Sequence, residues 1–318
     1  MNEEEIMVPV YTVTGFLEGG KTTFLNFTID QEYFQIDEPT LLIVTEEGME
    51  QYDEKMLLQN HTVMTSVENE EDFTTETLQK FENKYKPSRV IIEFNPFWGV
   101  AKLEEMEMPK GWGIVQEIVI VDASSFGIYM QNMKSLFVEM AKNADMVTFN
   151  RCTQEMPLAN YRRSIKVVNP GCEVLFEDND NELTDIFEDS LPYDLEAPVI
   201  EIEDVDYGIF YVDAGENKEN YEEKTVSFKG KVLKSRKEDA DYFVAGRRAM
   251  TCCADDTAFI GYVVKWPESP QLAMGEWVQV TAKIKYRSLK IYGGEGPVLY
   301  ARSVEKTDPP EHELVYFT

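Results

Sequence analysis

One segment near the N-terminus constrains the fold of this chain more than any other. Residues 8–26 read VPVYTVTGFLEGGKTTFLN, and residues 15–22 match the pattern G-x-x-x-x-G-K-[ST]. An apolar, β-branched run precedes the pattern, and a stretch that can form a helix follows it. A strand, a glycine-rich loop and a helix in this order form a phosphate-binding loop, because loop N–H groups and the helix N-terminus face the phosphates. The motif therefore predicts an α/β fold that binds a nucleotide.

The motif also assigns roles to its side chains. Lys21 is expected to reach the β- and γ-phosphates of the nucleotide. The hydroxyl of Thr22 is expected to bind Mg²⁺. Both roles need the flanking strand and helix, since an ordinary tight turn between a strand and a helix is the alternative interpretation.

Strand-like and helix-like segments alternate over the first 195 residues. Several strand-like segments are continuously apolar, as expected for strands that are covered on both faces. Apolar residues recur at helical spacing over 126–141. This alternation predicts a doubly wound, mostly parallel sheet in a domain that spans 1–195. The expected strands are 8–14, 40–45, 61–67, 89–94, 117–122, 146–150 and 172–176.

The pattern becomes all-β after residue 224. Turn residues separate five strand-like runs, which predicts a small barrel of the OB type, with a small β-sandwich as the alternative. The second domain would span 196–318, with the acidic stretch 196–223 leading into it. The expected strands are 225–233, 242–252, 258–266, 276–287 and 297–304.

Composition limits the partners and the location. The net charge is −29, and the acidic excess lies in residues 1–223, whereas 224–310 carries a small positive charge. So acidic a chain is not expected to bind nucleic acid electrostatically. The chain has no apolar run of 18 residues, which argues against membrane insertion, and its acidic start, MNEEEIM, does not resemble a signal peptide. Four cysteines do not suggest a disulfide framework, so we expect a cytoplasmic protein.

Several segments in order, from Val10 to about Glu177, resemble the CobW-like P-loop GTPases, a family linked to metal-cofactor assembly and metallochaperone work. The resemblance implies Mg²⁺-dependent hydrolysis of GTP or another nucleoside triphosphate. The matching segments are GFLEGGKTT at 15–23, the switch-like LIVTEEGMEQYDEKML at 42–57, the Walker B-like RVIIEFNPF at 89–97, IVDASSF at 120–126 and ADMVTFNR at 144–151, which contains the base-recognition motif.

The resemblance extends the candidate site. Glu93 stands where the family has a glutamate, so it is expected to hold Mg²⁺ through water and to act with Lys21 in catalysis. Asp53 is a further candidate Mg²⁺ ligand, and Glu46 lies in the same switch-like segment. The expected nucleotide-binding residues are Gly15, Glu18, Gly19, Gly20, Lys21, Thr22, Thr23, Asn150 and Arg151.

The chain departs from the family at three places. Thr153 stands where the family has the aspartate that reads guanine, and a threonine cannot accept two hydrogen bonds from that base, which predicts weak discrimination between GTP and ATP. Glu18 replaces a glycine and is expected to bring negative charge near the phosphates. The family's Cys-x-Cys-Cys metal motif corresponds to HTVMTSVENEED, which lacks cysteine. The first domain is therefore not expected to bind a transition metal in the family's way.

A cysteine pair in the second domain is the other candidate metal site. Cys252, Cys253 and Asp256 could bind Zn²⁺ or a similar ion. Adjacent side chains of a regular strand point to opposite faces, so both thiolates could reach one ion only if the strand ends or bulges there. The alternative is one cysteine in the core and one at its rim. The segments FVAGRRAMTCCADD, GEWVQVTAKI and PPEHELVYF resemble a C-terminal domain of bacterial permease-associated membrane proteins, which implies transport or metal handling and a protein or permease partner.

Three hypotheses of function follow. The first is a slow, Mg²⁺-dependent, CobW-like nucleoside triphosphatase that couples hydrolysis to metal handling or to a partner protein. Slow turnover is expected because the sequence shows no obvious catalytic glutamine or arginine finger. The second is a nucleotide-binding regulator with little or no hydrolysis, associated with a transport system. The third is an OB-type nucleic-acid-binding module, which the net charge of −29 disfavours.

Overall fold

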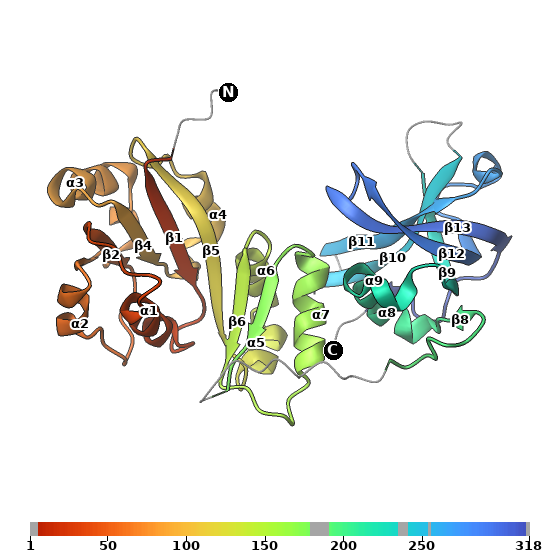
Figure 1. Ribbon diagram of the computed structural model, residues 1–318, viewed down its shortest axis with the longest axis horizontal. Coiled ribbons are helices and arrows are strands. Elements are labelled where there is room, and N and C mark those ends of the chain that lie inside the picture. Colours follow the sequence, from red (N-terminus) through yellow and green to blue (C-terminus); the bar gives the residue numbers. More distant parts are fainter. Residues whose placement is uncertain (1–5, 179–190, 235–240, 254–255, 316–318) are drawn as a thin grey trace. The chain divides into compact units, whose positions relative to one another are not determined.

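The computed structural model describes residues 6–178, 191–234, 241–253 and 256–315 (Figure 1). The chain forms two compact units. The first consists of Met1–Leu158 and Asn169–Ile186, and the second of Ala159–Val168 and Phe187–Thr318.

The first unit is a parallel α/β sheet. Over its described residues, seven strands lie in the order β3-β2-β4-β1-β5-β6-β7, and each neighbouring pair is parallel. The expected doubly wound sheet is therefore confirmed. The strands are β1 (Val8–Thr14), β2 (Thr40–Val44), β3 (Thr62–Ser66), β4 (Arg89–Glu93), β5 (Trp112–Asp122), β6 (Met146–Asn150) and β7 (Glu173–Phe176). The helices between them are α1 (Lys21–Asp30), α2 (Glu54–Gln59), α3 (Thr75–Tyr85), α4 (Val100–Glu105), α5 (Phe126–Asn132) and α6 (Lys134–Ala141), with 3₁₀ turns η1 (Glu70–Asp72) and η2 (Pro96–Trp98).

Apolar residues on both faces of the central strands explain this layering. Leu41 and Ile43 of β2 lie in one core cluster, which also contains Leu78 of α3 and Leu103 of α4. Leu42, between them in sequence, lies in a second cluster with Leu25 of α1 and Leu57 of α2. Successive side chains of a strand point to opposite faces, so a continuously apolar strand requires helices on both sides. The carboxyl ends of β1 and β4 then meet at the edge of the sheet where α1 begins.

The second unit contains an all-β barrel. Its described strands follow the order β14-β10-β11-β13-β12-β9-β8, and a further pairing between β9 and β10 closes a five-stranded barrel. Within the barrel β11 and β13 are parallel, whereas the other paired strands are antiparallel. The expected small all-β barrel is confirmed. The strands are β8 (Ile200–Glu201), β9 (Thr225–Leu233), β10 (Tyr242–Cys253), β11 (Asp256–Lys265), β12 (Trp277–Leu289), β13 (Gly294–Lys306) and β14 (Leu314–Val315).

The acidic stretch before the barrel contains helices that the sequence patterns did not indicate. Helix α8 (Tyr207–Glu216) buries Tyr207 and Phe210 against the barrel strands, and α9 (Lys218–Tyr221) follows it. Most of helix α7 (Leu158–Val168) belongs to this unit. Its Arg162 and Lys166 both form ion pairs with Glu216 of α8. The unit also has two 3₁₀ turns, η3 (Asp204–Asp206) and η4 (Ser269–Gln271).

The segment 126–141, where apolar residues recur at helical spacing, forms two helices. The structure divides it into α5 and α6 at Met133, whose φ of −137° leaves the helical region. The apolar spacing extends across the break, so the periodicity of side chains did not reveal it. Phe126, Phe137 and Met140 are nevertheless all buried, as the spacing predicted.

Candidate functional site: a phosphate-binding loop and its surroundings

The glycine-rich loop lies between the end of β1 and the start of α1. Gly15 has a φ of +146°, and a Cβ atom there would lie 2.2 Å from the carbonyl oxygen of Ile120 on β5. Gly20, with a φ of +98°, would bring a Cβ atom to 2.5 Å from the Asn150 side chain. Both positions therefore require glycine for backbone conformation and for space. The loop is packed against β5 and the end of β6, which holds it in a defined shape at the first turn of α1.

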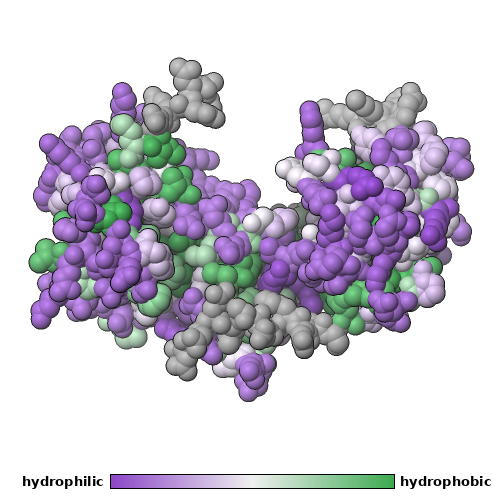
Figure 2. Space-filling view, viewed as in Figure 1, coloured by the Kyte–Doolittle hydropathy of each residue, from purple (hydrophilic) through white to green (hydrophobic). Residues whose placement is uncertain are grey.

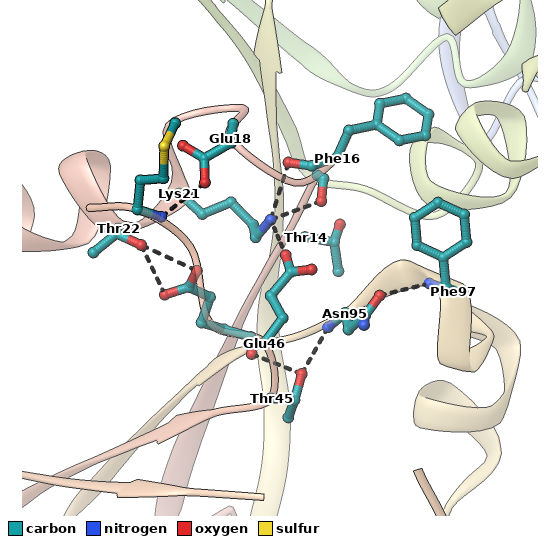
Figure 3. A network of polar contacts seen from close by, with 12 residues as sticks. Thr14, Phe16, Glu18, Lys21, Thr22, Thr45, Glu46, Asn95 and Phe97 are labelled. Atoms are coloured by element: carbon teal, nitrogen blue, oxygen red, sulfur yellow. Dashed lines mark hydrogen bonds and ion pairs between the residues drawn. The ribbon is translucent and has the colours of Figure 1, made fainter. Parts of the chain in front are cut away.

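Lys21 is buried in the loop, with 3% of its surface exposed. Its ammonium donates hydrogen bonds to the backbone oxygens of Gly15, at 2.8 Å, and Phe16, at 3.1 Å. It also forms an ion pair with Glu46, whose side chain is 9% exposed. In Figure 3 Phe16 and Glu46 lie at the end of the Lys21 side chain. The lysine is therefore oriented by the loop itself and neutralised by an acidic residue from the segment after β2.

A second polar cluster joins Thr22 to the end of β4. The Thr22 hydroxyl donates to the two carboxylate oxygens of Glu93 at 3.3 and 3.5 Å. The Tyr52 hydroxyl donates to the same carboxylate. Glu93 is 3% exposed, and burial raises the pKa of its carboxyl although the bond from Tyr52 and the charge of Lys21 oppose the shift. Burial and the negative charge of Glu93 also raise the pKa of Tyr52, which keeps its hydroxyl a donor.

The chain after β4 is fixed beside this cluster. The Thr45 hydroxyl donates to the backbone oxygen of Glu93 at 3.1 Å and accepts from the N–H of Asn95 at 2.7 Å. The Asn95 side chain then accepts from the N–H of Phe97, at 3.0 Å, in the turn η2. The backbone of Glu93 is thus held by Thr45, which follows β2, and its carboxylate by Thr22 and Tyr52.

Asp53, the other expected Mg²⁺ ligand, lies at the start of α2. Its Oδ1 atom accepts from the backbone N–H groups of Lys55 and Met56 at 2.9 and 3.2 Å, which caps that helix. Its own N–H bonds to the Asn26 side chain at 3.3 Å, and Asn26 also donates to the backbone oxygen of Gln51 at 3.1 Å. The structure therefore brings Glu93, rather than Asp53, into contact with Thr22.

The expected base-recognition residues lie on the other side of the loop. The Asn150 amide donates to the backbone oxygen of Gly19 at 2.8 Å, while its Oδ1 is buried and accepts no hydrogen bond from the described residues. Arg151 donates to the backbone oxygen of Glu18 at 3.2 Å and pairs with Asp122. Although burial opposes it, bonds from Ser124 and Arg151 lower the pKa of Asp122. Asn150 and Arg151 thus connect the end of β6 to the loop through hydrogen bonds.

The side chain of Glu18 does not lie as expected. Its backbone has a φ of +60°, and its Oε1 accepts from the N–H of Met49 at 2.8 Å. The negative charge that the sequence suggested for the phosphate site is therefore directed to the segment after β2. The sequence could not reveal this, because the contact joins residues 31 positions apart through the backbone of Met49.

A cavity of about 810 Å³ lies beside the loop, between α1 and the sheet face of β1, β5, β6 and β7. Thr23, Asn150 and Arg151 line it near the loop, and Glu177 and Asp178 line it at the end of β7. Its apolar lining comes mainly from aromatic side chains of α1 and the following turn and from the strands. In Figure 2 hydrophobic surface gathers over β5 and β6 amid mostly hydrophilic surroundings. Neither Tyr52 nor this cavity leaves a local motif in the sequence, so neither could be predicted from it.

The backbone around the cysteine pair has the irregularity that a shared metal would need. Strand β10 ends at Cys253, and its pairing with β11 shifts register between Met250 and Cys253. Cys253 pairs with Asp256 on the neighbouring strand. The side chains of the three candidate ligands lie outside the described residues. Among side chains that the structure does describe, no three His, Cys, Asp or Glu residues come together as a metal site.

The parallel sheet and the loop at its edge define the class of P-loop nucleotide-binding proteins. The family can be stated as well. The model of the CobW/HypB/UreG nucleotide-binding domain matches residues 9–176, more than half of the chain, so this chain belongs to the CobW/HypB/UreG family. The model of the DUF1980 C-terminal domain matches residues 179–317. Curated proteins include no match to the chain.

Solved structures resemble the chain at low sequence identity. Zn(II)-bound YjiA GTPase from E. coli is 20% identical, over 52% of this chain and 56% of that chain, with a TM-score of 0.40. A Zn(II)-bound triple mutant of YjiA is 18% identical over 56% and 59%, with a TM-score of 0.42. Hydrogenase maturation factor HypB from Archaeoglobus fulgidus is 11% identical over 54% and 81%, with a TM-score of 0.40. The present chain thus spans less than two thirds of the YjiA chains that it matches.

Over the part of the chain that the structure describes, no helix is both long enough and apolar enough to cross a bilayer.

Proposed function

We propose that the protein is a slow, Mg²⁺-dependent nucleoside triphosphatase that couples hydrolysis to metal handling or to a protein partner. One observation carries the proposal: Lys21 lies buried against the glycine-rich loop, beside a threonine that contacts the strand-end acid Glu93. Phosphoryl transfer to water needs mainly positioning and charge neutralisation. A fixed ammonium, loop N–H groups and a helix N-terminus are the groups that supply them.

The residues beside Lys21 fit a Mg²⁺ site. Thr22 and Glu93 offer a hydroxyl and a buried carboxylate within 3.3 Å of each other, and Mg²⁺ prefers such hard oxygen ligands. When bound, Mg²⁺ would neutralise charge on the phosphate oxygens. Thr22 would bind the ion directly, and Glu93 would hold it through water or orient the attacking water.

The same contacts bear on the rate. Glu93 contacts the Thr22 hydroxyl, and its raised pKa suits a group that takes up a proton from water. The phosphate loop itself, GFLEGGKTT, contains neither a glutamine nor an arginine that could complete the transition-state contacts. We therefore expect turnover well below that of a GTPase with a catalytic glutamine and an arginine finger. The same feature favours the alternative, a nucleotide-binding regulator with little hydrolysis.

The cavity beside α1 is where we expect the base of the nucleotide. Asn150 and Arg151 connect it to the phosphate loop, and the buried Oδ1 of Asn150 is an acceptor that a base N–H could satisfy. Thr153 replaces the family's guanine-reading aspartate. We therefore expect GTP and ATP to bind within about tenfold of each other, or about 1.4 kcal/mol.

A nucleotide panel tests this function. Binding of GTP, ATP, GDP and ADP is measured by calorimetry with and without Mg²⁺, and phosphate release is measured in parallel. Tight Mg²⁺-dependent binding with measurable release supports a triphosphatase, and binding without release supports the regulator. A preference for GTP above a hundredfold would mean that another residue reads the base, and absence of all nucleotide binding would overturn the proposal.

The second unit supports a separate proposal, a transition-metal site in a barrel of the OB type. The strand order with β11 parallel to β13 supports the barrel type, and the register shift before Cys253 supports the metal. Cys252, Cys253 and Asp256 would hold about one Zn²⁺ per chain. Replacing both cysteines with serine should remove the ion and destabilise the barrel while nucleotide affinity is unchanged. Wild-type protein that takes up no Zn²⁺ or Cu(I) under reducing conditions would favour core cysteines.

A further inference from the structure

Two backbone oxygens and one carboxylate surround the ammonium of Lys21. It donates hydrogen bonds to the oxygens of Gly15 and Phe16 and forms an ion pair with the Glu46 carboxylate. The two backbone oxygens belong to the loop, whose shape is fixed by its packing against β5. Glu46 belongs to the segment after β2 and is therefore the acceptor that a competing anion could displace.

The segment that carries Glu46 is attached to the site at further points. The N–H of Met49 donates to Glu18 at 2.8 Å, which links the segment to the loop (Figure 3). The hydroxyl of Tyr52 donates to Glu93, whose carboxylate also contacts Thr22. Residues 46–52 thus contact each of the groups proposed to act on phosphate and Mg²⁺: the loop, Lys21, and the Thr22–Glu93 pair. We call residues 46–52 the capping segment.

We propose that Glu46 is an internal competitor for the phosphate site. Its carboxylate neutralises Lys21 where a nucleotide phosphate would have to do so, and the capping segment must release Lys21 before a triphosphate is fully bound. The inference rests on the proposed function, because it requires that Lys21 bind phosphate. It adds a regulatory property: affinity depends on how often the segment opens, so a partner that holds the segment away would load the protein with nucleotide.

A purely structural ion pair makes the opposite prediction. If Glu46 only stabilised the fold or helped to orient Lys21 for phosphate, removing its charge would weaken binding or leave it unchanged. If Glu46 competes, removing its charge must strengthen binding. The apparent affinity of a protein is its intrinsic affinity multiplied by the fraction of molecules in the binding-competent state. A segment that is open for about a tenth of the time therefore lowers the apparent affinity about tenfold.

The test uses Glu46→Gln in the full chain, with inorganic tripolyphosphate, GTP and ATP as probes. Tripolyphosphate reports on the phosphate site without a base. Glu46→Gln should bind each probe about tenfold more tightly than the wild type, mainly through faster association. The matched control is Glu47→Gln, the same change at the next residue, which is exposed and should leave affinity unaltered.

A second pair of variants keeps the test independent of the stability of Glu46→Gln. Met49→Pro removes the N–H that Glu18 accepts and leaves every charge in place, whereas Met49→Ala retains that N–H. Met49 is 84% exposed, so neither change disturbs the core. Met49→Pro should tighten tripolyphosphate binding, and Met49→Ala should not.

The outcomes separate the two proposals. If the wild type binds triphosphates but neither Glu46→Gln nor Met49→Pro binds them more tightly, Glu46 is not a competitor, and the triphosphatase proposal stands. If both variants bind more tightly than their controls, both proposals are supported. If no variant binds tripolyphosphate or nucleotide, the phosphate site and the competitor are both wrong.

Discussion

A buried basic side chain in each of the two units has quite different partners. Lys21 in the first unit is 3% exposed, and its partners are two loop carbonyls and the carboxylate of Glu46. Arg247 in the second unit is 1% exposed. Its guanidinium donates to the backbone oxygens of Lys229 and Asp204 at 3.0 and 2.8 Å and pairs with the Asp204 carboxylate. It also lies over the rings of Tyr207 and Trp277, at 5.0 and 5.8 Å from their centroids.

The difference bears on the proposed role of Lys21. Arg247 donates through its planar guanidinium and lies over two aromatic rings, and its partners come from β9, β12, η3 and α8 of the second unit, so they belong to the packing of that unit. Among the described residues, the side chain that pairs with Lys21 is Glu46, which lies on a segment with exposed neighbours. This arrangement supports the proposal that Lys21 binds phosphate, whereas the partners of Arg247 support a role in stability.

The largest effect is expected for Lys21→Ala. Loss of the ammonium removes the main side-chain charge opposite the phosphates, so triphosphate affinity should fall about 1000-fold, or about 4 kcal/mol. The free energy of unfolding should change much less, because Glu46 can then turn to solvent. Calorimetric titration with GTP and ATP measures the first quantity, and urea unfolding the second. The exposed Lys55→Ala on α2 is the control, and an unchanged triphosphate affinity for Lys21→Ala would refute the assignment of the loop.

Arg247→Met should show the reverse pattern. The substitution leaves the carbonyls of Lys229 and Asp204 and the Asp204 carboxylate without their donor. Breaking a buried pair in this way should lower the stability of the second unit by about 3 kcal/mol, with no change in nucleotide affinity. Denaturant unfolding followed by hydrogen exchange of the barrel strands measures the loss.

Arg248→Met provides the comparison for that experiment, since Arg248 is the next residue on β10 and is exposed. It should alter stability only slightly. If the two substitutions lower the stability of the second unit equally, or if Arg247→Met weakens nucleotide binding, the proposed difference between Lys21 and Arg247 is wrong.

A smaller effect is expected from pH. Burial, together with the negative charges of Glu104 and Asp145, raises the pKa of Glu117 on β5 to about 7. An unfolded glutamate titrates near about 4.3, so between these values the folded state binds the additional proton. The stability of the first unit should therefore fall as the pH rises through this range.

Unfolding of the first unit at pH 5 and at pH 7.5 measures that dependence. Glu117→Gln should flatten it, whereas Glu107→Gln, at an exposed position on the same unit, should not. A first unit whose stability is constant over this range in the wild type would show that Glu117 is not perturbed.

The secondary structure of the two units could not be predicted equally well from the sequence. The strands of the first unit are continuous runs such as TLLIV and RVIIE, buried on both faces, and their predicted bounds differ little from those observed, except for the early start of β5 at Trp112. The break at Met133 and helices α8 and α9 were missed. Helix α8 is rich in aromatic and β-branched residues that locally favour strands, and only its packing against the barrel makes it helical.

The amino-acid sequence by itself determined which residues can form the phosphate-binding loop, because glycines at positions 15 and 20 and the lysine at 21 act through backbone geometry and charge over a few neighbouring residues. It also determined the alternation of strands and helices, since burial on both faces is a property of each strand. Only the tertiary structure decided which acids meet the loop. Asp53 caps a helix, Glu93 contacts Thr22, and Glu46 pairs with Lys21, although all three were candidates for the site. The physical reason is that the contacts of Glu46 and Glu93 join residues 25 and 71 positions apart, and such contacts are set by how the strands pack rather than by any local pattern.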